Sequence, residues 1–297
     1  MATEPMADPT VPAPALWLVD KTAGPTSHDI VALARRRLGR TVKVGHSGTL
    51  DPFATGLLVV MVGRATRLAP YLSGLDKTYL ATVRTGFVSA TLDPEGPIEA
   101  SGTPVPAERI GDVLPGFAGL QLQRVPALSA VRVGGERLYA KARRGEDVDL
   151  PEREVAIHAI RLVDDLGDGE VTIEVRCGAG TYIRRLASDI GERLGCGAYC
   201  SALRRTAIGG LSVDDAVSPD DVAPLGGLDP LRGLGHLPVR RLSAEETARV
   251  LHGGRVADAE AVEGPVALVG HEGRLVAVAT HDGAGALRPA VVIEDPR

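Results

Sequence analysis

Short hydrophobic runs separated by glycine- and proline-rich turns dominate the first 210 positions of the chain, a pattern typical of strands in a sheet. Two stretches depart from it. Residues 30–38, which follow a capping box at residues 26–29, and residues 183–194 carry apolar side chains at helical spacing, which predicts two amphipathic helices. The pattern also predicts a short helix over residues 65–72, a basic helix after the glycines 134–135, and strands over residues 15–20, 57–62, 78–84, 128–133, 155–163, 170–177 and 198–206.

The order of these elements predicts the fold class. Consecutive strands joined by a short turn, such as residues 155–163 and 170–177, pair in an antiparallel sense. A doubly wound parallel sheet would need a regular alternation of strand and helix, which the chain lacks. We therefore expect an α+β domain with a largely antiparallel mixed sheet that is flanked by helices.

Composition divides the chain into four segments. Residues 1–14 are rich in proline and alanine, and we expect them to form a disordered tail. The main domain is expected over residues 15–217, and the proline- and glycine-rich residues 218–238 resemble a linker. Residues 239–297 contain a short helix followed by two apolar strands, which predicts a small β-rich domain.

Composition also argues against several classes of protein. No run approaches the ~18 apolar residues of a membrane span. The first 14 residues lack the basic start and apolar core of a signal peptide, so a cytoplasmic protein is expected. Cys177, Cys196 and Cys200 are an odd number without a CxxC pair, which argues against a disulfide framework and a structural zinc site. Walker, GxGxxG and HExxH motifs are missing from the sequence, so we expect neither a metal nor an organic cofactor.

The distribution of charge is more informative than its total. The net charge of −5 is unusual for a protein that binds nucleic acid, but the acidic excess lies in residues 211–297, which hold 8 basic and 14 acidic residues. Basic residues gather in clusters that are compatible with a local RNA footprint and equally with solvated helix faces. These clusters are Arg35–Arg37 with Arg40, residues 132–144, Arg184 with Arg185, and Arg204 with Arg205.

One loop stands out for its chemistry. Residues 45–56 read GHSGTLDPFATG, so that a single acid, Asp51, lies among glycines, hydroxyl groups and one histidine. Pro52 fixes φ directly after the acid, and the strand over residues 57–62 follows at once. A carboxylate on a stiff loop against a core strand suits a nucleophile or a general base. The alternative is an Asp-Pro turn without chemistry, and the rest of the sequence bears on the choice.

Six blocks of the sequence match the pattern of one enzyme family. They are LVDKTAGPTSHD (18–29), GHSGTLDPFATG (45–56), DKTYLATVRTG (76–86), SAVRVGGERLYAKARRG (129–145), GTYIRRLASDIGERLG (180–195) and LRRTAIG (203–209). In this order they resemble the bacterial tRNA pseudouridine-55 synthase family (TruB type), and several ordered blocks are far more specific than one motif. The resemblance implies the pseudouridine synthase fold for the main domain and a PUA-like fold for residues 239–297.

The resemblance implies an isomerase that needs no metal or cofactor. Such an enzyme breaks the N-glycosidic bond of uridine 55 in the TΨC loop of tRNA, rotates the base and rejoins it through carbon. Asp51 matches the family's essential acid, and Arg184 matches an arginine that is expected to pair with it and lower its pKa. Tyr79 matches a tyrosine that stacks on the base and is able to move a proton. Whether Asp51 attacks the ribose, attacks the base or removes a ribose proton stays open.

The same resemblance implies a set of substrate-binding residues. His46 matches a histidine that occupies the space left by the flipped-out nucleotide, whose unstacking costs a few kcal/mol. Lys21 is expected to support the active site or contact phosphate, and Asp93 to lie in a segment that faces the RNA. The expected partner is the TΨC stem-loop of tRNA, bound by a monomer that needs no protein partner and no membrane. The other expected contacts are Tyr182, Leu203, Arg132, Arg143 and Arg144.

Some positions depart from the family's pattern. Thr22 replaces a proline, Leu128 a tyrosine and Arg132 a lysine, and residues 87–96 lack one aspartate. These differences bear on RNA contacts and leave Asp51 in place. Three rival functions stay open: a tRNA-binding protein without catalysis, a synthase that acts on another RNA or is guided by partner proteins, and a nucleotide-dependent enzyme whose glycines cradle phosphate.

Overall fold

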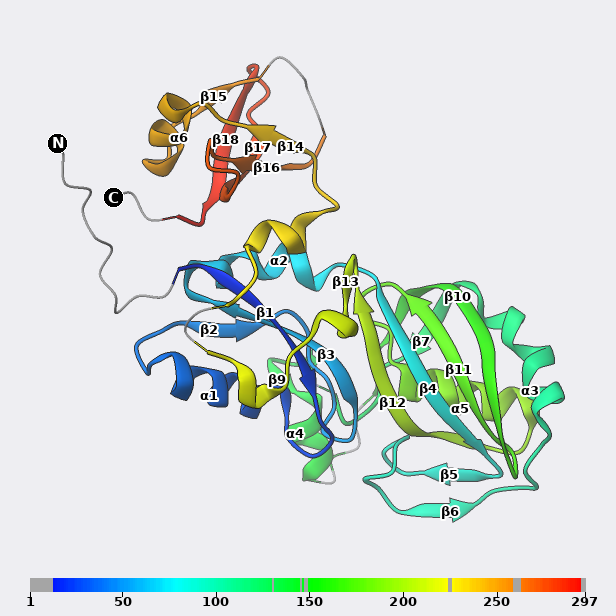
Figure 1. Ribbon diagram of the computed structural model, residues 1–297. Helices are drawn as coiled ribbons and strands as arrows, with labels where there is room; N and C mark the ends of the chain where they lie inside the picture. The colour runs from blue at the N-terminus through cyan, green and yellow to red at the C-terminus, as the bar shows by residue number, and fades with distance from the viewer. Residues whose placement is uncertain are drawn as a thin grey trace.

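A nine-stranded sheet forms the main body of the protein (Figure 1). The computed structural model describes residues 13–129, 131–144, 146, 149–223, 226–258 and 263–294. The strands of this sheet are β1 (Ala15–Lys21), β2 (Val44–His46), β3 (Thr55–Val62), β4 (Lys77–Thr85), β7 (Gly119–Arg124), β10 (Glu152–Gly167), β11 (Glu170–Cys177), β12 (Ala198–Ile208) and β13 (Leu211–Ser212). Their order is β1-β3-β12-β4-β11-β10-β7, with β2 beside β3 and β13 beside β12.

The sheet is largely antiparallel, which confirms the prediction from sequence. Strand β12 pairs with β3 in parallel, and the other pairings of this sheet are antiparallel. Where β12 pairs with β4, its register shifts around Ser201 and again around Thr206. Such bulges bend a strand and redirect its side chains. Because β12 lies between β3 and β4, it joins the two halves of the sheet.

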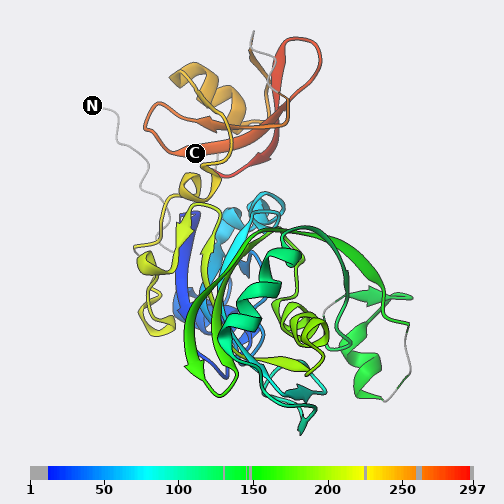
Figure 2. The same cartoon turned by 90° about the vertical axis from the view of Figure 1, so that its right-hand side faces the viewer.

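Helices cover one face of each half of the sheet. Helix α1 (Ser27–Leu38) begins at the predicted capping box and packs its apolar stripe against β1 and β3. Helices α3 (Ala107–Val113) and α5 (Ile183–Leu194) lie inside the curve of the other half, as Figure 2 shows. These two helices pack on the face of the sheet that carries Tyr79.

Two predicted elements differ in the structure. The predicted helix over residues 65–72 is a 3₁₀ helix, η1 (Gly63–Leu68), followed by α2 (Ala69–Ser73). Pro70 lies in the first turn of α2, where a proline starts a helix readily but cannot continue the preceding one. The turn-rich residues 89–103 contain a hairpin of β5 (Phe87–Ser89) and β6 (Ile98–Ala100).

The strand predicted over residues 128–133 is wrong for most of its length. Only β8 (Arg132–Val133) forms, and it pairs with β9 (Glu136–Arg137) across the predicted glycine turn. The predicted basic helix follows as α4 (Leu138–Arg143). Residues 128–129 form bends instead, and the carbonyl of Leu128 accepts a hydrogen bond from Arg184 of α5 (Ile183–Leu194).

A second, smaller sheet near the C-terminus confirms the expected β-rich domain. It consists of β14 (Val239–Arg241), β15 (Val256–Ala257), β16 (Pro265–Val269), β17 (Leu275–His281) and β18 (Ala286–Val292), with helix α6 (Ala244–Leu251) beside it. The segment predicted as a linker packs on the main sheet: Leu228 pairs with Leu16, and Leu234 is fully buried. The remaining short helices are η2 (Leu114–Phe117), η3 (Val213–Asp215), η4 (Pro219–Asp221) and η5 (Pro230–Leu234).

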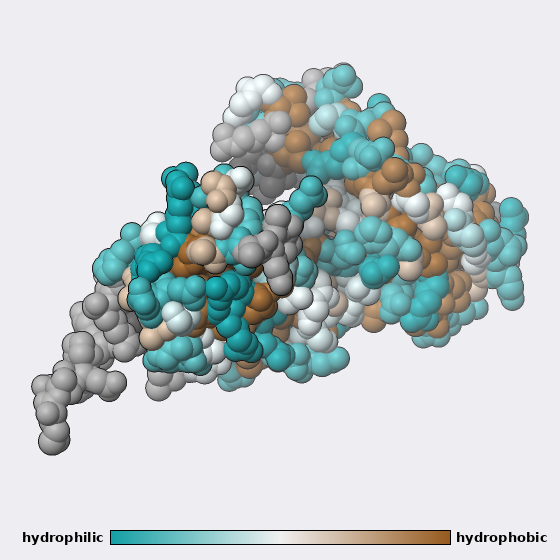
Figure 3. All heavy atoms as spheres, turned by 90° about the horizontal axis from the view of Figure 1, so that it is seen from above, coloured by the Kyte–Doolittle hydropathy of each residue, from teal (hydrophilic) through white to brown (hydrophobic). Residues whose placement is uncertain are grey.

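The surface seen from the side of the C-terminal domain mixes hydrophilic and hydrophobic side chains (Figure 3). In the described part of the chain, no helix is both long and apolar enough to cross a membrane.

Candidate active site

The loop that carries Asp51 is anchored to α1. It runs from the end of β2 at His46 to the start of β3 at Thr55. The hydroxyl of Ser27 accepts a hydrogen bond from the Leu50 N–H at 2.8 Å and donates one to the Leu50 carbonyl at 3.1 Å. Because both backbone groups of Leu50 are bound, the position of the next residue, Asp51, is fixed.

Lys21 anchors the other side of this loop. Its side chain is fully buried, and its ammonium group donates to the carbonyl of Pro52 at 3.0 Å and to that of Thr22 at 2.9 Å. Burial lowers the pKa of Lys21, and the nearby carboxylate of Asp51 opposes that shift. Lys21 therefore lies where it supports the loop, which is one of the two roles that the sequence left open.

Arg184 stands between two carboxylates. It lies in the first turn of α5, and its side chain is 3% exposed. Its Nε lies 2.8 Å from Oδ2 of Asp51, close but without hydrogen-bond alignment, and its Nη2 donates to Oδ1 of Asp51 at 3.3 Å. Its Nη1 donates to Oδ2 of Asp93 at 3.0 Å. The expected pair of Asp51 and Arg184 is thus present, and Asp93 joins it.

Two backbone carbonyls complete the surroundings of Arg184. Its Nη1 donates to the carbonyl of Thr91 at 2.9 Å, and its Nη2 donates to that of Leu128 at 3.0 Å. A buried guanidinium must satisfy its donors within the protein, because the cost of burying a charge is otherwise too high. The carbonyl of Leu128, in the bend at residues 128–129, meets part of this requirement.

Asp93 is a buried residue in an unusual turn. Its side chain is 4% exposed, and its carboxylate accepts a hydrogen bond from the N–H of Glu95 at 3.0 Å. The preceding residue, Leu92, has a φ of 66°, which is rare for leucine, and its carbonyl accepts from the N–H of Cys200 at 3.1 Å. Such strain persists only where the surrounding contacts maintain it. The sequence placed Asp93 in a segment that faces the RNA, whereas the structure turns its carboxylate inward to Arg184.

The environment of Asp51 raises its pKa. The largest cause is burial, which disfavours the charged form, while Arg184 and Lys21 oppose the shift and Asp93 adds to it. The sequence suggested that Arg184 lowers this pKa, but the loss of hydration outweighs the ion pair. One third of the side-chain surface stays exposed, so the carboxylate can be reached from outside.

Tyr79 lies on β4 beside the acid, with its side chain almost fully buried. It belongs to the same apolar cluster as Leu203 of β12 and Leu50 of the loop that carries Asp51. Burial raises the pKa of the Tyr79 hydroxyl, which the nearby charge of Arg205 opposes. The phenol is therefore neutral at physiological pH and available as a proton donor.

His46 is a half-buried residue whose ring orientation is defined. Its Nδ1 accepts a hydrogen bond from the N–H of Gly48 at 3.2 Å. Burial lowers the pKa of His46, and the charge of Arg205 lowers it further. The ring is therefore neutral near pH 7, with its proton on Nε2, where it can donate a hydrogen bond.

Tyr182 is the residue that precedes α5, and its backbone is clamped by one side chain. The amide group of Gln123 accepts from the Tyr182 N–H at 2.8 Å and donates to the Tyr182 carbonyl at 3.0 Å. The guanidinium of Arg153 lies 5.3 Å from the centre of the Tyr182 ring. The start of α5, and with it Arg184, is thereby fixed to β7.

The basic residues that the sequence grouped together differ in their exposure. Arg144 is half exposed and pairs with Glu136 and Glu146, at 2.6 and 2.7 Å. The side chains of Arg132 and Arg143 lie outside the described residues. Arg184 and Arg205 are buried, so these two cannot contribute to an exposed RNA footprint.

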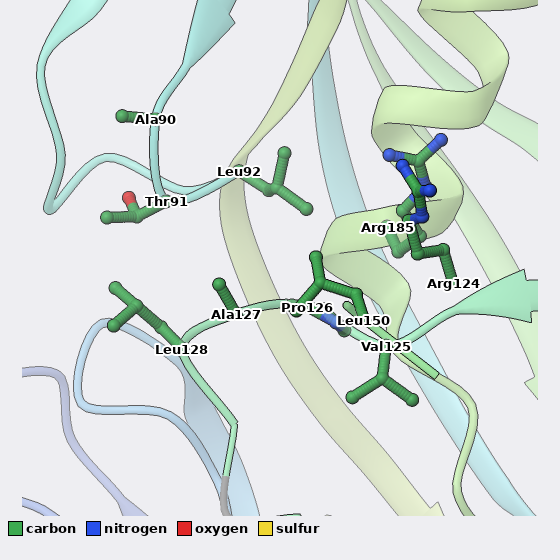
Figure 4. Close-up of a pocket in the computed structure, with 10 residues that line it drawn as sticks. All are labelled: Ala90, Thr91, Leu92, Arg124, Val125, Pro126, Ala127, Leu128, Leu150 and Arg185. Atoms are coloured by element: carbon green, nitrogen blue, oxygen red, sulfur yellow. The ribbon is translucent and has the colours of Figure 1, made fainter. Parts of the chain in front are cut away.

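A cavity of about 180 Å³ lies beside this site, between two segments that Arg184 holds through their carbonyls (Figure 4). One wall contains Thr91 and Leu92, and the other contains Leu128. Figure 4 shows the side chain of Arg185 on the far side of the cavity from Leu128. The cavity is thus built from the same segments as the site itself.

Three residues of the site were missed from the sequence. Ser27 and Gln123 act on backbone groups, which leaves no pattern in a single sequence. Arg205 was grouped with exposed basic residues, although its position two residues after the apolar Leu203 places both on one face of a strand.

The cysteines show no features of a reactive or metal-binding site. All three are free and buried. Burial raises the pKa of Cys177 to about 11, so this thiol stays protonated. Within the described ranges, no group of three or more His, Cys, Asp or Glu side chains is close enough to hold a metal ion.

Solved structures share this fold. One chain in the structure of an H/ACA ribonucleoprotein bound to a substrate RNA containing 2′-deoxyuridine is 24% identical, with a TM-score of 0.73, over 95% of this chain and 86% of that one. A chain of a Cbf5–Nop10–Gar1 complex matches with a TM-score of 0.71 and 24% identity, over 95% and 85% of the two chains. These likenesses support the fold described above.

Sequence comparison identifies the family. Residues 35–183 match the N-terminal domain of the TruB family pseudouridylate synthases, residues 184–225 match the tRNA pseudouridylate synthase B C-terminal domain, and residues 238–293 match the C-terminal region of pseudouridine synthase II TruB. The chain belongs to the TruB family of pseudouridylate synthases.

Several relatives span nearly the whole chain. The protein named tRNA pseudouridine synthase B from Synechococcus sp. (strain WH7803) is 44% identical over 292 residues, which cover 93% of this chain and 96% of the relative. The protein of the same name from Thermobifida fusca (strain YX) is 43% identical, over 93% of this chain and 97% of the relative. The one from Syntrophobacter fumaroxidans is 41% identical, over 89% and 92%.

Proposed function

We propose that this protein converts uridine 55 in the TΨC loop of tRNA to pseudouridine, with Asp51 as the essential acid. The observation that carries the proposal is the ion pair between Asp51 and Arg184. The loop that carries Asp51 is anchored by hydrogen bonds at Leu50 and Pro52. A carboxylate that is held by a buried arginine on one side and exposed on the other suits covalent or acid–base catalysis. A protein that only binds RNA has no need of such an acid, which argues against the non-catalytic alternative.

The reaction exchanges one bond of the base for another. The bond between N1 of uracil and C1′ of the ribose breaks, the base rotates, and a bond forms between C5 and C1′. N1 gains a proton and C5 loses one, so the sum of atoms and electrons is unchanged. The freed base must be held against escape and hydrolysis, which requires a closed site.

The residues of the site divide these tasks. Asp51, in its ionised form, is the group that attacks the ribose or the base or takes up a ribose proton. Arg184 holds it in place through two contacts. Tyr79 offers an aromatic face for stacking and a neutral phenol as a proton donor, and Leu203 packs beside it. His46 presents Nε2 to the space that the nucleotide leaves on flipping.

We further propose that the enzyme acts on free tRNA in the cytoplasm, as a monomer without a guiding partner. The relatives that cover the whole chain are named as tRNA pseudouridine synthases, which supports tRNA as the substrate class. Arg132, Arg143 and Arg144 are proposed to meet phosphates of the stem. On binding RNA, Arg144 would exchange its contacts with Glu136 and Glu146 for phosphate contacts.

The proposal is tested with tRNA transcripts that carry tritium at C5 of uridine. We expect the purified protein to release one tritium per tRNA, and to release none from a transcript in which uridine 55 is replaced by cytidine. Release that persists with the cytidine transcript would contradict the assigned position. No release from any tRNA, together with stabilisation of the protein by millimolar ATP or GTP, would favour the nucleotide-dependent alternative.

A further inference from the structure

Arg205 is a buried arginine for which the described residues offer no acidic partner. Its side chain is 1% exposed, which makes it one of the largest fully buried groups in the protein. It donates from Nε to the carbonyl of Leu57 at 2.8 Å, from Nη2 to that of Gly48 at 3.1 Å, and from Nη1 to that of Thr49 at 3.4 Å. A buried cation without a counter-ion is costly, so a role beyond packing is to be expected.

The position of Arg205 in the sheet is central to the site. On β12 it lies opposite Gly56 of β3 and opposite Tyr79 of β4. Gly56 has a φ of 98°, and a Cβ atom there would lie 2.3 Å from the carbonyl oxygen of Arg205. Only glycine allows β3 and β12 to approach so closely. Arg205 is thus inserted between the loop of Asp51 and the strand of Tyr79.

The charge of Arg205 acts on Tyr79, the residue opposite it where β12 pairs with β4. The positive guanidinium favours the charged form of the phenol, so it opposes the rise in the pKa of Tyr79 that burial causes. Arg205 thus influences the acidity of the phenol as well as the position of the Asp51 loop.

We propose that Arg205 is a positioning residue for the isomerisation, which fixes the loop of Asp51 and places a positive charge beside the phenol of Tyr79. The inference rests on the proposed function. Arg205 acts through these two residues and does not touch the RNA, because its side chain is buried. Its task differs from that of Arg184, which contacts the acid itself.

Kinetics of Arg205→Lys and Arg205→Gln test the inference. Lysine keeps the charge but lacks the planar fork that binds three carbonyls at once. We expect Arg205→Lys to lower the single-turnover rate about 10- to 100-fold, since small misplacements of reacting groups have effects of this size. Arg205→Gln, which also lacks the charge, should be at least as slow. The Kd for tRNA should change by less than about threefold, because no RNA contact is lost.

A double-mutant cycle with Tyr79→Phe distinguishes an effect of Arg205 on Tyr79 from a general loss of activity through altered folding. If Arg205 acts through Tyr79, the variant that combines Arg205→Lys with Tyr79→Phe should be no more than about threefold slower than the slower single variant. Effects that multiply would overturn the coupling. A wild-type protein without activity would instead remove the proposed function, and a tRNA affinity that falls in parallel with the rate would make Arg205 a binding residue.

Ile208→Ala provides the matched control. Ile208 is fully buried on the same strand but belongs to a different apolar cluster, so its truncation lowers thermal stability without touching the site. We expect this variant to keep the wild-type rate below its Tm. If Arg205→Lys loses no more activity than Ile208→Ala, the inference is wrong. Should Arg205→Gln not fold, Arg205→Lys decides alone: a wild-type rate in that variant would show that the three carbonyl contacts of the guanidinium do not position the loop.

Discussion

Arg184 and Asp51 approach within 2.8 Å, yet the side chain of the arginine is 3% exposed and that of the acid 33%. The arginine is fixed from the far side by Asp93 and by the carbonyls of Thr91 and Leu128. Arg184 therefore holds Asp51 from the buried side and leaves part of the carboxylate exposed. The carboxylate of Asp51 is thus held in place while it stays accessible from outside.

Asp93→Asn should slow catalysis without weakening binding. The change keeps the size of the side chain but removes the charge that holds Nη1 of Arg184. Arg184 then shifts toward its remaining carboxylate, and we expect the single-turnover rate to fall about 10- to 100-fold. Asp112→Asn is the control, because it makes the same charge change at an exposed position of α3. Equal rates for Asp93→Asn and Asp112→Asn would show that the second carboxylate has no part in catalysis.

The rate should fall in mild acid. Only the ionised form of Asp51 can act as nucleophile or base, and burial raises its pKa above the ordinary value of 3.8. We therefore expect the single-turnover rate to decrease on acidification with a midpoint above 3.8. The measurement is a rate profile over roughly pH 3 to 8, with tRNA affinity followed in parallel. A rate that stays level down to the ordinary pKa of an aspartate would contradict this environment.

Asp51→Asn should stabilise the folded protein at neutral pH. A carboxyl group with a raised pKa in the folded state binds its proton more tightly there than in the unfolded chain, so its ionisation lowers the free energy of unfolding. Asparagine avoids this cost, and we expect a gain of about 0.5 kcal/mol or more, as is common when a functional group is removed. The gain should shrink as the pH falls through the raised pKa of Asp51. Thermal unfolding of both proteins at several pH values measures it, and a less stable variant at pH 7 would count against the raised pKa.

Gly56→Ala should disrupt the junction between β3 and β12. The added Cβ atom would lie 2.3 Å from the carbonyl oxygen of Arg205, at a backbone φ of 98°. We expect a loss of about 2 kcal/mol or more in the free energy of unfolding, together with a lower rate. Gly111→Ala in α3 is the control: nothing lies within 4 Å of its added carbon, and helix propensity favours alanine. Equal stability of the two variants in urea would refute the close approach.

The sequence predicted the parts of the site that depend on neighbours along the chain. The loop around Asp51 was evident because its glycines, its proline and the following strand lie within one short stretch. Arg184 was found through the resemblance of the block GTYIR, and the helix that carries it through its apolar spacing. The alternation along β12, which puts Leu203 and Arg205 on the buried face and leaves Arg204 to pair with Asp20, was present in the sequence, but Arg205 was grouped with the exposed basic residues.

What the sequence could not predict depends on contacts between distant residues. Asp93 turns inward because Leu92 adopts a positive φ and its carbonyl is bound by Cys200, more than 100 residues away. No local propensity favours that conformation for leucine. The direction of the pKa shift of Asp51 was likewise hidden, because burial depends on the packing of the whole site. At residues 128–129 of the predicted strand, the carbonyl of Leu128 likewise accepts a hydrogen bond from a distant residue, Arg184.

The most direct test of the account is a comparison of wild type with Asp51→Asn. Both proteins are mixed in excess with tRNA labelled with tritium at C5 of uridine, and tritium release and tRNA affinity are measured on the same samples. We expect release from the wild type alone, with a Kd for the variant within about tenfold of the wild-type value, because the side chains are nearly equal in size and one charge is removed. Tritium release by purified Asp51→Asn at a rate near that of the wild type would contradict the central role of Asp51.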